Sequence, residues 1–77
     1  MNAWLTLYSR VGCHLCERAE DLLAEHAPNC QVVDVDADED LRTRYGLRVP
    51  VLVSGETVLL EGKFAEADVL GLLSPDG

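Results

Sequence analysis

Residues 3–16 of the chain read AWLTLYSRVGCHLC and join an apolar segment to a pair of cysteines. Residues 3–8 are rich in apolar, aromatic and branched side chains, which is typical of a buried β-strand. Residues 9–12 follow as a turn. The sequence therefore predicts a strand that leads directly into the segment bearing Cys13 and Cys16.

The spacing of the apolar residues changes after Cys13. Charged side chains now separate side chains that recur about every 3.6 positions, which is typical of an amphipathic helix. The recurring residues are Leu15, Cys16, Ala19, Leu22, Leu23 and His26. We expect this helix to begin near Cys13 and to end at Pro28-Asn29.

The remainder of the chain continues to alternate between strands and helices. Valine-rich residues 31–35 predict a second strand, and the acidic and then basic residues 36–44 predict a short helix capped by Gly46. Pro50 opens a third strand over 51–53, which a turn returns as a fourth strand over 57–60. Residues 65–73 return to helical spacing, and 74–77 are a tail.

The resulting order, β-α-β-α-β-β-α, predicts an α/β fold with a four-stranded mixed sheet. The first strand–helix–strand unit implies a right-handed parallel crossover, and the later hairpin adds antiparallel pairing. With 77 residues and no linker or repeat, we expect one domain over residues 1–77.

The charge of the chain argues against several classes of partner. Fourteen acidic residues against six basic ones give a formal net charge of −8. Nucleic acid and anionic membrane surfaces would repel such a chain. No apolar run approaches the roughly 20 residues needed to span a bilayer, and residues 1–8 lack the basic start of a signal peptide. We therefore expect a cytoplasmic monomer that binds neither nucleic acid nor membrane.

Cys13 and Cys16 are spaced C-x-x-C at the predicted start of the first helix. The free N–H groups and the positive end of a helix favour a thiolate at its first turn. Cys16 lies one turn further along the same face, so the two sulfurs can meet. Cys13 is therefore the candidate nucleophile and Cys16 the candidate resolving thiol of a disulfide exchange. Arg10 and His14 are nearby groups that could stabilise the Cys13 thiolate.

Two other roles for these cysteines are open. Both could be small buried core residues. With His26 and Cys30 they also form the pattern C-x2-C-x9-H-x3-C, which offers four zinc ligands. A helix would separate Cys16 from His26 by about 15 Å, too far for two ligands of one zinc ion. We therefore expect no metal site, and we expect Cys30 to be a packed thiol.

Residues 7–16, LYSRVGCHLC, resemble the strand and C-x-x-C entry of the glutaredoxins. Residues 45–52, YGLRVPVL, resemble the cis-proline segment of the thioredoxin superfamily. The resemblance, which is strongest to small bacterial glutaredoxin-like proteins, covers nearly the whole chain. It implies the minimal glutaredoxin type of thioredoxin-like fold and a thiol–disulfide oxidoreductase, with Cys13 as nucleophile and Cys16 as resolving thiol. It also implies a cis Val49–Pro50 bond, beside which the Val49 backbone could pair with a bound peptide.

The resemblance also bears on glutathione. Arg10 stands where glutaredoxins usually have a glutathione-binding lysine, and Val49, Pro50 and Gly62 are the other candidate contacts for glutathione or substrate. The chain departs from the family pattern in having no Pro-Tyr between its cysteines and one glycine, Gly62, where the family has two. Glutathione is therefore a candidate co-substrate, and no bound cofactor is expected.

Three functional hypotheses follow. The first is reduction of protein disulfides or glutathione mixed disulfides, with glutathione or an enzyme of the thioredoxin-reductase type as reductant. The alternative is a non-catalytic adaptor that binds a protein partner beside Pro50. This alternative is motivated partly by Leu7, which stands where thioredoxins carry a buried acid. The third is carriage of zinc, or of an iron–sulfur cluster shared by two chains.

Overall fold

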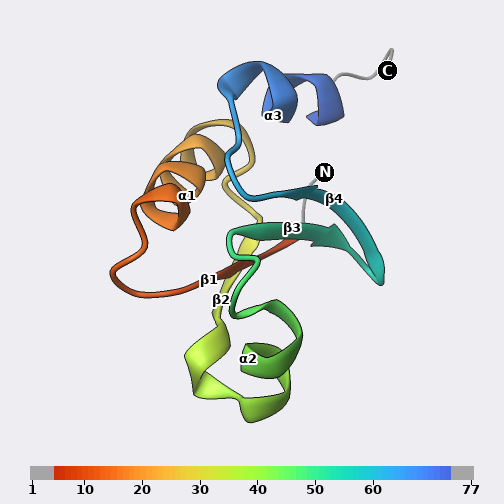
Figure 1. Cartoon of the computed structure of the whole chain (residues 1–77). Coiled ribbons are helices and arrows are strands. Elements are labelled where there is room, and N and C mark those ends of the chain that lie inside the picture. The colour runs from red at the N-terminus through yellow and green to blue at the C-terminus, as the bar shows by residue number, and fades with distance from the viewer. Residues whose placement is uncertain (1–4, 74–77) are drawn as a thin grey trace.

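A computed structural model describes residues 5–73 as a four-stranded sheet covered by helices on both faces (Figure 1). The element order β-α-β-α-β-β-α is confirmed, with one 3-10 turn, η1, between the second strand and the second helix. In chain order the elements are β1 (Leu5–Ser9), α1 (His14–His26), β2 (Gln31–Asp34), η1 (Val35–Ala37), α2 (Glu39–Tyr45), β3 (Val51–Ser54), β4 (Thr57–Glu61) and α3 (Glu66–Leu73).

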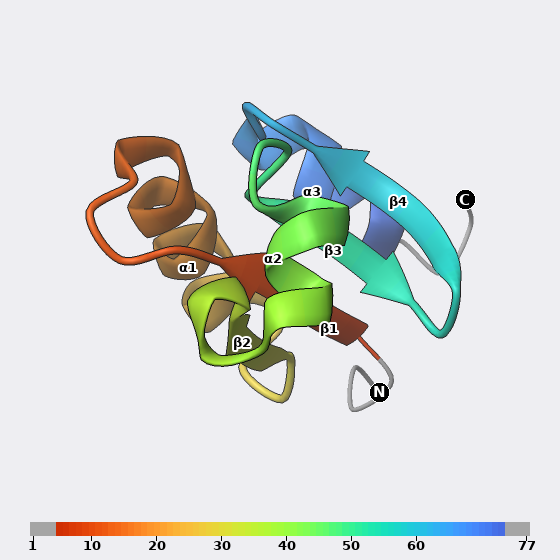
Figure 2. The same ribbon diagram turned by 60° about the horizontal axis from the view of Figure 1, so that its bottom comes forward.

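The strands lie in the order β2-β1-β3-β4, so β1 and β3 are the central pair. β1 runs parallel to β2 and antiparallel to β3, and β3 pairs antiparallel with β4. The sheet is therefore mixed, as predicted. Helices α1 and α3 lie on one side of it and α2 on the other (Figure 1), and the turned view brings α2 in front of the sheet (Figure 2).

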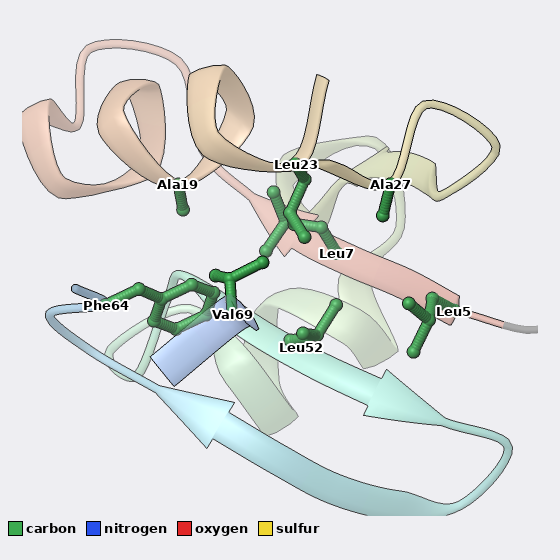
Figure 3. Close-up of a cluster of buried hydrophobic side chains, with 8 residues drawn as sticks. All are labelled: Leu5, Leu7, Ala19, Leu23, Ala27, Leu52, Phe64 and Val69. Atoms are coloured by element: carbon green, nitrogen blue, oxygen red, sulfur yellow. The ribbon is translucent and has the colours of Figure 1, made fainter. Parts of the chain in front are cut away.

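The main hydrophobic core lies between the sheet and the α1–α3 layer (Figure 3). Leu5 and Leu7 alternate with half-buried residues along β1, so both point toward α1. Leu23 of α1 and Leu52 of β3 meet them, and each of these leucines is at most 1% exposed. Burial of one such side chain contributes about 1.5–3 kcal/mol, so this layer anchors β1 and α1 to each other.

A second cluster lies on the opposite face, under α2. Val51 and Val53 of β3 pack against Tyr45 at the end of α2. The Tyr45 ring stacks on that of Tyr8, with 4.5 Å between ring centroids. Alternate side chains of β1 and β3 point to opposite faces of the sheet, so the two central strands are buried on each side.

Three local expectations need correction or restriction. The second strand ends at Asp34, because the Asp34 carboxylate accepts the N–H of Asp36 and turns the chain into η1, which buries Val35. Leu15 belongs to the apolar spacing of the first helix but is 41% exposed, since the buried stripe of α1 runs through Cys16, Ala19 and Leu23. The predicted strand residues 3–4 lie outside the described residues.

Within residues 5–73, every helix is too short or too polar to cross a bilayer.

Candidate thiol site

Cys13 is the residue that caps the N-terminus of α1. Its backbone is extended, with φ −98° and ψ 113°, and its Sγ accepts the N–H of Cys16 at 3.2 Å. Gly12 precedes it with φ 83°, a left-handed conformation that favours glycine and turns the loop into the helix. The half-buried Cys13 sulfur therefore lies where a helix N-terminus stabilises negative charge.

Cys16 is the buried member of the pair and is 0% exposed. Burial raises the pKa of its thiol to about 11, and its contact with Cys13 acts in the same direction. Contacts from the Arg10 backbone and the Ser9 hydroxyl oppose this rise. Both cysteines are free thiols in the structure. Cys13 is therefore the more accessible thiol of the two.

The raised pKa of Cys16 has a consequence for stability. The unfolded chain releases this proton near pH 9, whereas the folded protein keeps it until about pH 11. The unfolded state therefore binds fewer protons in this window, and the free energy of unfolding should fall as pH rises through it. Below pH 9 both states keep the proton and the contribution is constant.

Urea denaturation of the reduced protein between pH 7 and pH 11 measures this effect. Cys16→Ala should lose less stability across the window than the parent protein, because the titrating group is gone. An identical pH dependence in the two proteins would mean that Cys16 is not the group responsible.

Arg10 forms its hydrogen bonds with groups other than Cys13, although the charge of Cys13 also contributes to raising the Arg10 pKa. Its Nε and Nη2 donate to the two carboxylate oxygens of Asp36, at 2.9 and 2.8 Å, and its Nη1 donates to the Gly46 carbonyl at 3.1 Å. These hydrogen bonds hold the pKa of the Asp36 carboxyl below its usual range. Arg10 therefore ties the loop before Cys13 to η1 and to the end of α2.

His14 also differs from the expectation. Its side chain is fully exposed, and its Nδ1 lies 3.6 Å from a carboxylate oxygen of Glu17, one turn along α1. The structure thus pairs His14 with a helix neighbour rather than with Cys13. This follows from the helix geometry, because residues three apart share a face while adjacent residues diverge.

The Val49–Pro50 bond is cis, as the resemblance implied. Tyr8 lies opposite Val51 in the sheet. The loop that leaves β1 toward Cys13 and the loop that enters β3 from Pro50 therefore lie at the same end of the two strands. The Val49 N–H donates to the Tyr45 carbonyl at 3.0 Å. Pairing of a peptide with Val49 would therefore depend on the Val49 carbonyl.

Gly62 is brought next to this loop by a hydrogen bond from its N–H to the Pro50 carbonyl, 2.8 Å long. It has φ 78°, which favours glycine. Arg48, two residues before Pro50, forms a two-point ion pair with Glu61, at 2.9 and 3.1 Å. The guanidinium groups of Arg48 and Arg10 are thus both paired with carboxylates of the chain itself.

Two exposed apolar side chains that were not among the predicted site residues flank these loops. Val11, two residues before Cys13, is 86% exposed, and Leu47, three residues before Pro50, is 100% exposed. An apolar residue in a turn is the sequence signal that could have identified each of them. They give the site an apolar rim.

The four residues of the zinc-like pattern are not gathered. The helix predicted over this segment is confirmed, and it carries His26 to the far end of α1, where His26 Nε2 lies 2.8 Å from Glu66 Oε2. Cys30 is half-buried, its Sγ donates to the Gln31 carbonyl at 3.5 Å, and burial raises its thiol pKa. Cys30 is therefore a packed thiol, as expected.

One family model matches nearly the whole chain. A family model described as "Glutaredoxin-like domain (DUF836)" matches residues 4–74. The chain is 40% identical to the structural-genomics target protein XcR50 from X. campestris, with a TM-score of 0.78, over 90% of this chain and 93% of that one. A glutaredoxin from Archaeoglobus fulgidus has the same fold at 20% identity, with a TM-score of 0.68 over 91% of this chain and 85% of that one. The comparison with curated proteins found no match.

Proposed function

The chain belongs to the glutaredoxin-like domain family, and from this premise we propose that it is a thiol–disulfide oxidoreductase that uses Cys13 and Cys16. The observation that carries the proposal is the hydrogen bond from the Cys16 N–H to the Cys13 sulfur at the N-terminus of α1. It supports a nucleophilic thiolate on Cys13, with the second thiol one turn away.

The proposed reaction is a two-step exchange. The Cys13 thiolate attacks one sulfur of a substrate disulfide, so that a mixed disulfide forms and the other substrate sulfur leaves as a thiolate. Cys16 then loses its proton and attacks the Cys13 sulfur. The Cys13–Cys16 bond forms, the substrate sulfur leaves, and the substrate has gained two electrons and two protons. A thiol reductant, either glutathione or an enzyme of the thioredoxin-reductase type, returns the pair to two thiols.

Protein disulfides are the substrate class that the surroundings of Cys13 favour. Glutathione presents carboxylates, but Arg10 and Arg48 are both engaged with carboxylates of the chain. A peptide that covers the site would instead bury the exposed apolar side chains of Val11 and Leu47. Removal of apolar surface from water favours binding of such a peptide. Arg10, Val49, Pro50 and Gly62 then act by shaping the loops rather than by binding glutathione.

The proposal is tested by mild oxidation of the reduced protein followed by peptide mass spectrometry. We expect a Cys13–Cys16 disulfide, and reduction of an insulin-type protein disulfide at a higher kcat/KM than that of a glutathionylated peptide. A pair that stays unoxidised under these conditions would contradict the redox function. It would favour the alternative, an adaptor that binds a partner through the apolar rim beside Pro50.

One substitution tests the argument about Arg10. Asp36→Asn weakens the ion pair and should raise the rate on the glutathionylated peptide relative to the protein disulfide. Asp40→Asn is the matched control, because Asp40 pairs with Arg44 at 3.7 Å on the exposed side of α2. An equal effect of both variants would show that general charge, rather than the release of Arg10, changes the preference.

A further inference from the structure

A hydrogen bond between Ser9 and Glu20 lies beside the buried Cys16 thiol. The Ser9 hydroxyl donates to Glu20 Oε2 at 2.6 Å. Ser9 ends β1 on the strand face that points toward α1, the face of Leu5 and Leu7, and is 4% exposed. Glu20 follows Cys16 by four residues on α1, so the two side chains leave the helix on the same side. Ser9, at the end of β1, therefore faces the side of α1 that carries Cys16 and Glu20.

Resting on the proposed exchange reaction, we propose that Glu20, acting through the Ser9 hydroxyl, accepts the Cys16 proton when Cys16 resolves the mixed disulfide.

Resolution needs such a base, because a thiol must become a thiolate to attack a disulfide. Burial raises the pKa of Cys16 to about 11, so at neutral pH the group is a thiol. The position six residues before Cys13 cannot help, since Leu7 there is apolar and 0% exposed. Ser9 faces α1 from the end of β1, and its hydroxyl lowers the pKa of the Cys16 thiol against the effect of burial.

Cys16 passes its proton to the Ser9 oxygen as Ser9 passes its own to Glu20, so the serine is unchanged overall. The Cys16 sulfur forms a bond with the Cys13 sulfur, and the bond between Cys13 and the substrate sulfur breaks. The departing thiolate takes up a proton from water, and Glu20 returns its proton to water.

Glu20 has a route to water through a surface hollow of about 170 Å³. The hollow is lined by Ser9, Arg10, Val11, Glu20, Val32 and Asp34. Its other charged groups are Arg10, which is bound to Asp36, and Asp34, which accepts the Asp36 N–H. Glu20 is therefore both hydrogen-bonded to Ser9 and open to solvent, as a proton carrier must be.

The test separates the two chemical steps with an aromatic disulfide, 5,5′-dithiobis(2-nitrobenzoate), mixed with the reduced protein in a stopped-flow instrument. Attack by Cys13 releases one coloured thiolate, and resolution by Cys16 releases a second. All variants carry Cys30→Ser, so that no third thiol reacts. The first release reports the proposed function, and the second reports the proposed role of Glu20.

Glu20→Gln should leave the first release unchanged and slow the second about 10²-fold at pH 7, a typical effect of losing a general base. Ser9→Ala should do the same, whereas Ser9→Thr keeps a hydroxyl and should retain most of the rate. The deficit should shrink as pH approaches 11, where Cys16 ionises without assistance. Asp21→Asn, the neighbouring exposed acid on α1, is the charge-matched control.

Three outcomes are decisive. A second release that is equally fast in Glu20→Gln and Asp21→Asn would overturn the role of Glu20 and leave the redox function intact. A second release slowed by the same factor at every pH would also overturn it, because a merely structural effect has no such pH profile. If the Cys30→Ser parent gives no second release, the proposed function itself fails.

Discussion

Cys13→Ser should reduce the rate of disulfide reduction by at least on the order of 10³-fold, because an alcohol replaces the only sulfur in the proposed pair that a substrate can reach. The structural basis is the contrast between the half-buried Cys13 and the 0% exposed Cys16. The Cys16 thiol cannot substitute for Cys13, since it is enclosed by the packing of α1. Turnover of an insulin-type disulfide is the measurement.

Two further variants test which cysteine is the nucleophile. Cys16→Ser should still attack a substrate and accumulate a covalent mixed disulfide at Cys13, visible as an added mass that a reductant removes. Cys30→Ser should retain turnover, because Cys30 lies beyond α1 against Gln31. If Cys13→Ser retained turnover while Cys16→Ser lost all reaction with substrate, the nucleophile would have to be reassigned to Cys16.

Leu7→Ala should cost about 3 kcal/mol of unfolding free energy, within the range typical of a buried leucine. Leu7 is 0% exposed and belongs to β1, which is paired on both sides in the sheet. Its side chain points into the core layer between the sheet and α1 (Figure 3). In a chain of 77 residues, total stability is on the order of 4–12 kcal/mol, so this loss is a large fraction.

Thermal denaturation followed by circular dichroism checks the effect, which corresponds to a fall in Tm of about 12–24 °C for a domain of this size. Leu70→Ala on α3 is the matched control, because Leu70 is 47% exposed and should lose little. Similar falls in the two variants would mean that the α1 layer is not the main source of stability. Activity of Leu7→Ala should follow its folded fraction, since Leu7 touches no reacting atom.

The order of elements could be predicted because it depends on signals that act over a few residues. The change from strand to helical spacing at Cys13, the stop at Pro28-Asn29 and the turn after β3 are all local patterns, and the structure follows each. The error at Val35 has a local cause as well. An aspartate side chain, that of Asp34, captures a backbone N–H and ends the strand one residue early.

The interactions of the charged residues could not be predicted in the same way. Arg10 was expected to act on Cys13, three residues away. The charge of Cys13 does contribute to raising the Arg10 pKa, but the hydrogen bonds of Arg10 go to Asp36, 26 positions later in the chain. His14 was expected to act on its neighbour Cys13, but the turn of α1 points it toward Glu17.

Composition and spacing alone predicted the α/β order of elements and the position of the cysteine pair at a helix start, and the motifs at residues 7–16 and 45–52 carried the resemblance to glutaredoxins. Only the packing of the folded chain decided which carboxylate pairs with Arg10, how deeply Cys16 is buried and which acid accepts the Ser9 hydroxyl. The reason is physical. Periodicity records how each residue meets neighbours within a turn or two, whereas ion pairs, burial and proton routes join strands and helices that only the assembled sheet brings into contact.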